Sequence, residues 1–167
     1  MAKIVAVIGR KKSGKTTTAE FLVKHLAKDG FRIGSMKHAH HPNFTFDTKG
    51  KDTWKFAKAG AEMVIGVTTD ELAIINKTKT LQQDLDQLLD LFKDRGLDFI
   101  ILEGFHTLIS NRKDVYKIIT ARDEEGLKTI IPGTSRPILA ITGAIASKTA
   151  AVKSLEIPVI DINTHGD

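Results

Sequence analysis

Residues 9–16 read Gly9-Arg10-Lys11-Lys12-Ser13-Gly14-Lys15-Thr16, which is a complete P-loop motif. The preceding residues 3–8 are mostly apolar and β-branched, as is typical of a buried parallel strand. The following residues 17–29 place apolar side chains on one face of a predicted helix. Strand, glycine-rich loop and helix therefore follow one another in the order that binding of a nucleoside triphosphate requires.

The residues of this segment have distinct predicted roles. Lys15 would reach the β- and γ-phosphates, and the Thr16 hydroxyl would ligate Mg²⁺. Main-chain N–H groups would surround the phosphates, helped by the positive end of the helix dipole. The residues that we assign to nucleotide binding here are Gly9, Lys12, Ser13, Gly14, Lys15, Thr16 and Thr17.

Length and composition limit the classes of protein to which the chain can belong. A chain of 167 residues suits one domain, so we expect a single P-loop nucleotide-binding domain over residues 1–167. The absence of cysteine excludes disulfides, thiolate metal sites and a cysteine nucleophile. The longest apolar runs are about six residues, far below a membrane span, and the first strand leaves no room for a signal peptide. We expect a soluble cytoplasmic protein without membrane contact.

The formal net charge of +5 raises the question of nucleic-acid binding. The local excess of lysine lies at residues 10–15 and 37–58, around the predicted phosphate site. A triphosphate is itself a sufficient anionic partner for these charges. The chain also lacks the interleaved aromatic residues on which bases stack, so we do not expect it to bind nucleic acid.

Strand-like and helix-like segments alternate along the chain. Further strands are predicted at 31–36, 63–67, 72–75, 99–102, 116–120, 137–141 and 158–160. Further helices are predicted at 53–59, at 80–96, where Thr80 and Gln83 form a capping box, and weakly at 147–155. Within 105–136 the pattern is otherwise hard to interpret. Alternation of continuous apolar strands with helices predicts an α/β protein of the P-loop NTPase fold, with an open, mostly parallel sheet flanked by helices.

Glu103 follows the predicted strand 99–102 and precedes Gly104. Open α/β sheets bind their ligands at the carboxyl ends of the strands. In P-loop proteins, an acidic residue at the end of a neighbouring strand holds the Mg²⁺ shell or positions water. We therefore assign Glu103 to the metal shell, and we assign Glu103 and Lys15 to catalysis. The alternative is that Glu103 is a surface carboxylate before a glycine turn, with no role in a site.

The segment 37–53 contains three histidines, His38, His40 and His41, and several charged residues. Imidazole is a common ligand of transition metals. Successive residues of an extended strand point to opposite faces, however, so the three histidines do not easily converge. Of three interpretations of this segment, we favour contact with an anionic substrate. The other two are a transition-metal site and a loop whose residues have no role in a site. We expect Lys37, His38 and His41 to contact the anionic ligand, with Asp47 or Asp52 near Mg²⁺. Of these two we assign Asp47 to the metal and Asp52 to ligand binding.

The residues that would recognise the base are less evident. The segment Asn76-Lys77-Thr78-Lys79 resembles a guanine-reading motif, but Lys79 stands where the base-reading carboxylate should be, so we do not assign it. Better candidates lie in the late loops 142–147 and 161–163. The segment 140–143 carries no acidic residue after its strand.

The motifs together resemble those of the MobB family, the GTP-binding proteins of molybdopterin guanine dinucleotide synthesis. The segments that carry the resemblance, besides the P-loop, are Lys37-His38-Ala39-His40-His41, Gly50-Lys51-Asp52-Thr53, Lys58-Ala59-Gly60-Ala61, Leu102-Glu103-Gly104-Phe105 and Arg122-Asp123. The likeness extends from about residue 4 to about residue 123, and its combination of motifs is more specific than the P-loop alone.

The resemblance implies a P-loop fold of the class that includes metallocentre-assembly GTPases, usually as a homodimer. It implies GTP as ligand, with weak hydrolysis at most. It also implies molybdopterin and the molybdenum cofactor guanylyltransferase as partners, which the protein would assist in making the guanine dinucleotide.

A small-molecule kinase that uses ATP is the alternative, since it would share the same phosphate-binding loop. A kinase usually has an arginine-bearing lid, and only the short segments 111–113 and 121–123 could supply such arginines.

Overall fold

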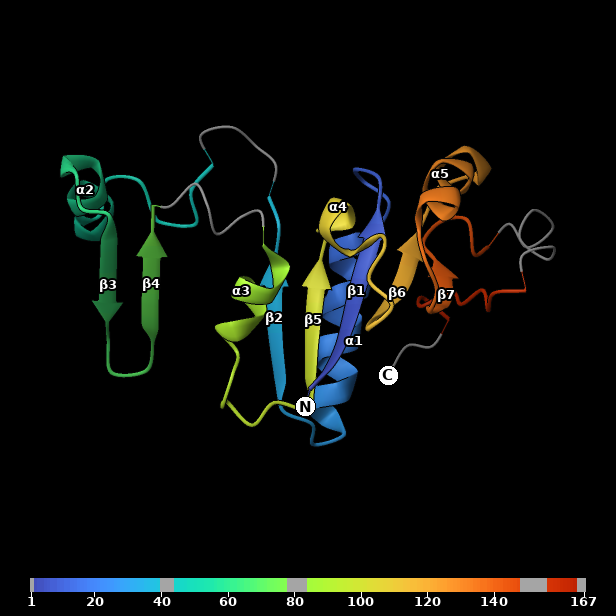
Figure 1. The fold of residues 1–167 in the computed structure, drawn as a ribbon, viewed down its shortest axis with the longest axis horizontal. Coiled ribbons are helices and arrows are strands. Elements are labelled where there is room, and N and C mark those ends of the chain that lie inside the picture. The colour runs from blue at the N-terminus through green and yellow to red at the C-terminus, as the bar shows by residue number, and fades with distance from the viewer. Residues whose placement is uncertain (1, 40–43, 78–83, 148–155, 165–167) are drawn as a thin grey trace. The chain divides into compact units, whose positions relative to one another are not determined.

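The computed structural model describes residues 2–39, 44–77, 84–147 and 156–164 (Figure 1). The chain forms two compact units, one made of Met1–His38 together with Leu89–Asp167 and the other of Ala39–Leu88. The prediction of a single domain over 1–167 stays a prediction.

A parallel sheet of five strands organises the first unit (Figure 1). Its strands stand in the order β2-β5-β1-β6-β7, and every pair of neighbours is parallel. The bounds are β1 Lys3–Gly9, β2 Ile33–Lys37, β5 Phe99–Glu103, β6 Val115–Thr120 and β7 Ile138–Thr142. Each of these strands was predicted to within two residues. The open parallel sheet is thereby confirmed.

Helices cover this sheet because its central strands are apolar on both faces. Residues Val5–Ile8 are buried without alternation, which is typical of a parallel strand covered on both sides. Helix α1 (Lys15–Lys28) packs against β1, β2 and β5, where Leu22 and Val23 pack against a cluster of buried residues that includes Ile101. The short helix α4 (His106–Ile109) contacts β1, and α5 (Glu124–Ile130) follows β6.

The second unit contains a helix and a hairpin. Helix α2 (Asp52–Ala59) ends at Gly60, whose φ of 118° lies in the left-handed region that favours glycine. Strands β3 (Met63–Val67) and β4 (Leu72–Asn76) pair antiparallel through the turn at 68–71. The predicted helix and both predicted strands are confirmed.

The predicted helix 80–96 is wrong in its extent. The described helix α3 spans only Leu85–Asp90. Asp84 Oδ1 accepts the N–H groups of Asp86 and Gln87, at 2.9 and 3.3 Å, so Asp84 caps the helix in the place predicted for Thr80. The helix ends early because the chain turns after Asp90 and Asp94 has a φ of 59°. The capping pair Thr80 and Gln83 lies outside the described residues.

Other differences lie in the last third of the chain. Sequence patterns missed α4, α5 and the 3-10 turn Ile131–Gly133. The predicted strand 158–160 is reduced to a single parallel bridge between Ile141 and Val159. The predicted helix 147–155 lies, from residue 148 onward, outside the described residues.

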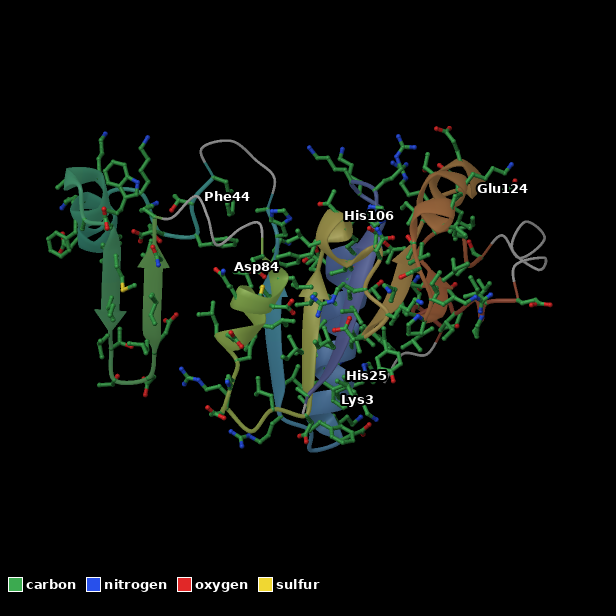
Figure 2. The ribbon with its side chains drawn as sticks, in the orientation of Figure 1. Lys3, His25, Phe44, Asp84, His106 and Glu124 are labelled. Carbon is green, nitrogen blue, oxygen red and sulfur yellow. The ribbon has the colours of Figure 1, made fainter. Side chains whose placement is uncertain are left out.

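The direction of the strands places the predicted site at one end of the first unit. Lys3, at the start of β1, and His25, near the end of α1, lie at one end in Figure 2, and His106 and Glu124 lie at the other. The carboxyl ends of all five parallel strands meet at this second end. Within the described residues, no helix has the length and apolar character needed to cross a membrane.

Candidate functional site

The P-loop connects β1 to α1, and its conformation depends on small or left-handed residues. Lys12 has a φ of 62° and Gly14 a φ of 101°, and Gly14 stands at the N-cap of α1. A Cβ atom on Gly9 would overlap the hydroxyl groups of Thr120 and Ser13. Glycine is therefore required at position 9 by close packing and favoured at position 14 by the backbone.

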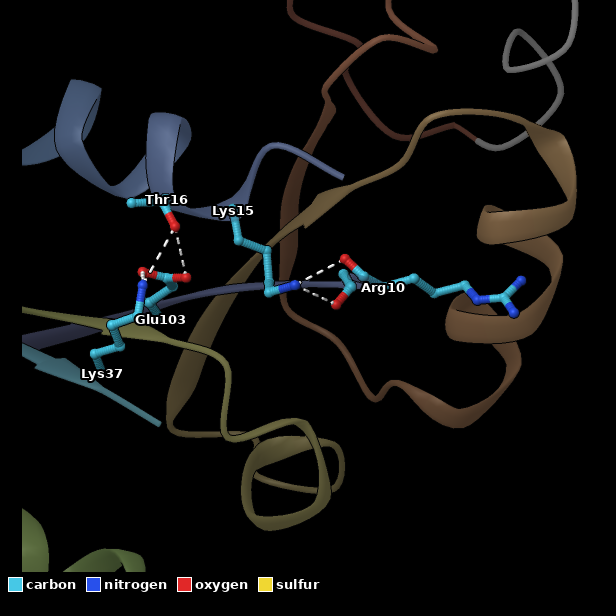
Figure 3. A network of polar contacts seen from close by, with 6 residues as sticks. Arg10, Lys15, Thr16, Lys37 and Glu103 are labelled. Carbon is cyan, nitrogen blue, oxygen red and sulfur yellow. Dashed lines mark hydrogen bonds and ion pairs between the residues drawn. The ribbon is translucent and has the colours of Figure 1, made fainter. Parts of the chain in front are cut away.

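The Lys15 ammonium group is held by the loop itself. Its Nζ donates to the carbonyl oxygens of Gly9 and Arg10, at 2.9 and 2.7 Å (Figure 3). Burial lowers the pKa of Lys15 below its ordinary value of 10.5, the nearby Glu103 raises it, and Lys37 lowers it further. A partly desolvated cation in a loop of main-chain N–H groups is suited to binding phosphate.

Thr16, Lys37 and Glu103 form a polar cluster next to the loop (Figure 3). Thr16 Oγ1 donates to Glu103 Oε1 at 2.8 Å, and Lys37 Nζ donates to Glu103 Oε2 at 2.8 Å. The Glu103 side chain is only 14% exposed. These three residues come from α1, β2 and β5, and parallel strand register sets Lys37 beside Glu103. Sequence reasoning had assigned all three to the site, and the structure brings them together.

The oxygen atoms of this cluster fit Mg²⁺. A hydroxyl and a carboxylate are hard oxygen donors, which Mg²⁺ prefers, and Mg²⁺ is commonly bound by one or two protein groups together with substrate phosphates. Within the described part of the chain, no group of three or more His, Cys, Asp or Glu side chains could hold a metal by itself. The donor set of Thr16 and Glu103 thus suits a metal that arrives with phosphates.

Thr120, which the sequence reasoning missed, supports the loop from β6. Its Oγ1 lies 2.6 Å from Ser13 Oγ and donates to the Ile8 carbonyl at 3.2 Å. Ser13 is only 5% exposed, so its hydroxyl is committed to this contact. The predicted role of Ser13 in phosphate binding is therefore limited to its main-chain N–H. A threonine that ends a strand at the carboxyl edge of the sheet was the available signal.

Gly143, at the end of β7, also touches the loop. A Cβ atom at this position would lie 2.6 Å from the Ala121 carbonyl and 2.7 Å from the Ser13 carbonyl. The φ of 94° adds a second reason for glycine. The position directly after Thr142 therefore has no space for a base-reading carboxylate.

His38 follows the cluster at the end of β2. Its ring stacks on that of Phe105, with centroids 4.9 Å apart, and its main-chain N–H donates to the Glu103 carbonyl at 3.0 Å. Gly104 and Phe105 both have positive φ, which turns the chain sharply beneath His38. His38 thus lies beside the turn that directly follows Glu103.

The remaining predicted site residues lie in the second unit or outside the described residues. Asp47 Oδ1 accepts the Thr53 hydroxyl at 2.8 Å, and Asp52 Oδ1 accepts Lys55 Nζ at 3.0 Å, both within that unit. Asp47 and Asp52 belong to the second unit and the P-loop to the first, so their assignments stay predictions. His40 and His41 lie outside the described residues.

Comparison with known proteins identifies the family. The model of the family described as MobB, molybdopterin guanine dinucleotide synthesis protein B, matches residues 4–144. A Methanocaldococcus jannaschii protein, named as a putative molybdopterin-guanine dinucleotide biosynthesis adapter protein, is 33% identical over 124 residues, covering 74% of this chain and 49% of its own. The molybdopterin-guanine dinucleotide biosynthesis adapter protein of Haemophilus influenzae is 32% identical over 121 residues, covering 72% of this chain and 64% of its own. The chain thus spans about half to just under two thirds of the length of these relatives.

Solved structures agree on the fold. The crystal structure of Bacillus subtilis MobB has a TM-score of 0.75 at 24% identity, covering 96% of this chain and 90% of that chain. This likeness confirms the predicted P-loop NTPase fold. With the match to its family model over residues 4–144, the chain belongs to the MobB family.

Proposed function

We propose that this protein binds GTP with Mg²⁺ at its P-loop and acts as an adapter in molybdopterin-guanine dinucleotide biosynthesis. The observation that carries the proposal is the contact of Thr16 with Glu103 beside the partly buried ammonium of Lys15. Lys15 would hold the β- and γ-phosphates, and Thr16 and Glu103 would hold Mg²⁺. Membership of the MobB family supports a role in this pathway, since both relatives compared are named as adapter proteins of molybdopterin-guanine dinucleotide biosynthesis.

Hydrolysis by this site would be slow at most. A fast GTPase needs a group that positions the attacking water and a cation that stabilises the transferring phosphoryl group. Glu103 is the carboxylate of the cluster, and both of its oxygens are engaged, by Thr16 and by Lys37. We therefore assign binding, rather than rapid turnover, as the main task of the site.

Selectivity for guanine would come from the late loops. Position 143 has no space for a carboxylate. The main-chain bond from Ile160 to the Ile141 carbonyl, of 2.9 Å, places the following residues at the carboxyl end of β7. Asp161 and Asn163 in that loop are therefore the residues we propose to contact the base.

Homodimer formation is part of the proposal and is supported by the β3–β4 hairpin. One face of this hairpin is apolar, because Met63, Ile65 and Val67 lie on the same face as Leu72 and Ile74. These five side chains are between 53% and 73% exposed. A continuous exposed apolar face usually marks a protein–protein contact, and a second copy of the chain would cover it. The test is the molar mass in solution: Ile65→Lys should give monomers where the native protein gives dimers.

The adapter proposal is tested with the guanylyltransferase of the same organism. The purified protein, GTP and Mg²⁺ are added to a reaction that converts molybdopterin to the guanine dinucleotide. The yield should rise, and Lys15→Ala should remove the increase. Absence of binding to the transferase, together with preference for ATP over GTP, would exclude the proposed function.

A small-molecule kinase is the second candidate, and one observation favours it. A groove of about 480 Å³ begins at Thr16, Lys37 and Glu103 and continues along apolar residues of α1 and the sheet, among them Val23 and Ile101. A groove in this position could hold an acceptor next to the γ-phosphate. Stoichiometric transfer of ³²P from labelled ATP to a small molecule in a cell extract would support the kinase.

A further inference from the structure

A second cavity lies on the other side of the P-loop, at the carboxyl end of β6. Its volume is about 280 Å³, close to the lower end of the range for small-molecule sites. This cavity, here named the β6 cavity, is lined by P-loop residues, among them Arg10, Lys11 and Ser13, and by residues that follow β6, among them Arg122 and Asp123. None of Lys15, Thr16 and Glu103 lines it.

The charged groups of the β6 cavity favour an anion. Arg10, Lys11 and Arg122 bring three cationic side chains to its lining. Asp123 is the acidic residue of the lining, and its Oδ1 accepts the Gly126 N–H at 2.9 Å. In the described part of the chain, neither Lys11 nor Arg122 forms an ion pair.

Arg10 is positioned for a ligand other than the one bound by Lys15. Its side chain extends away from Lys15 and Glu103, toward α5 (Figure 3). There it donates to Glu125 Oε1 at 3.3 Å, in a pair whose side chains are 58% and 82% exposed. Such an exposed pair is weak, so an anion in the cavity can replace Glu125 as the partner of Arg10.

We propose that the β6 cavity binds the phosphate group of a second ligand, a phosphomonoester, beside the nucleotide. Guanidinium groups form strong, charge-assisted bonds with phosphate oxygens, which suits Arg10 and Arg122. The cavity is larger than a phosphate alone needs, so part of the organic group enters with it. The inference rests on the proposed function, because the triphosphate would occupy the P-loop and the second ligand would lie next to it.

The test uses phenyl phosphate as the probe and isothermal titration calorimetry as the readout. The protein is first saturated with Mg²⁺ and a non-hydrolysable GTP analogue, so that the P-loop is filled. Phenyl phosphate should then bind, and Arg122→Gln should weaken this binding about tenfold or more. Lys128→Gln is the control, because it removes an exposed cation of α5, the helix that follows Arg122, and Lys128 lies outside the cavity lining. Glu125→Gln should strengthen binding, since it releases Arg10.

The triphosphate titration separates this inference from the proposed function. Arg122→Gln should leave the affinity for the GTP analogue unchanged. A parallel loss of affinity for the analogue would overturn the inference, because the cavity would then belong to the nucleotide site. Absence of phenyl phosphate binding, or binding that Arg122→Gln leaves unchanged, would also overturn it. If the native protein binds no triphosphate, the proposed function fails; phenyl phosphate binding that depends on Arg122 but not on Lys15 would still support the cavity.

Discussion

Replacement of Thr120 by valine tests how β6 supports the P-loop. Valine keeps the shape of threonine but removes the hydroxyl, which lies 2.6 Å from Ser13 Oγ and donates to the Ile8 carbonyl at 3.2 Å. Two buried hydrogen bonds are lost, and the Ser13 hydroxyl is left without a partner. Each such bond contributes about 1 kcal/mol, so the two together contribute about 2 kcal/mol. We expect the free energy of unfolding to fall by about 2 kcal/mol.

Urea denaturation measures this loss. With an m-value of about 2 kcal/mol per molar, the midpoint should fall by about 1 M. Thr120→Ser is the control: it keeps the hydroxyl and removes one methyl group, which costs about 0.8 kcal/mol. Ser13→Ala combined with Thr120→Val completes a double-mutant cycle, and its loss should be smaller than the sum of the single losses by about 1 kcal/mol. A midpoint unchanged by Thr120→Val, or strictly additive losses, would refute the assigned contact.

Three further predictions concern the site. Glu103→Gln should lower the affinity for GTP in the presence of Mg²⁺ by about tenfold or more, since it removes a charged metal ligand. In EDTA the same substitution should change the affinity for GTP little. Equal losses of affinity in both conditions would argue against a metal role for Glu103. Triphosphate affinity should be constant at neutral pH and should fall as the pH rises through the pKa of free Lys15, which lies below its ordinary value of 10.5, because the phosphates bind the protonated form. Titrations in a series of buffers check this. An affinity that stays constant up to pH 10.5 would contradict it. Gly143→Ala should destabilise the fold by about 1–3 kcal/mol, because the added Cβ would lie 2.6 Å from the Ala121 carbonyl and the residue has a φ of 94°. In the control Gly133→Ala the added Cβ would meet no atom within 4 Å, so the urea midpoint of unfolding should change little.

The sequence predicted the sheet and the P-loop well because both depend on local patterns. Continuous apolar runs mark the parallel strands, and the loop motif has a fixed spacing. The carboxyl-edge rule for parallel strands then sufficed to bring Glu103 to Thr16 and Lys37.

Features that depend on distant residues or on short elements were not predictable. The contact of Ser13 with Thr120 joins residues 107 positions apart, and it requires the order β1-β6 in the sheet. Helix α4 has four residues and α5 has seven, too few for a helical period to appear in the sequence. The apolar spacing that predicted the helix 80–96 extends beyond both ends of α3. The helix itself is shorter, because Asp84 caps it later than expected and the chain turns after Asp90.

The affinity for GTP with Mg²⁺ tests the central claim most directly, measured by calorimetry on the native protein and on Lys15→Ala. Lys28→Ala is the matched control, since Lys28 ends α1, far along the helix from the loop. We predict tight binding of GTP, weaker binding of ATP, almost no binding of either by Lys15→Ala, and no change for Lys28→Ala. GTP affinity retained within a few-fold in Lys15→Ala would contradict the assignment of the P-loop as the nucleotide site.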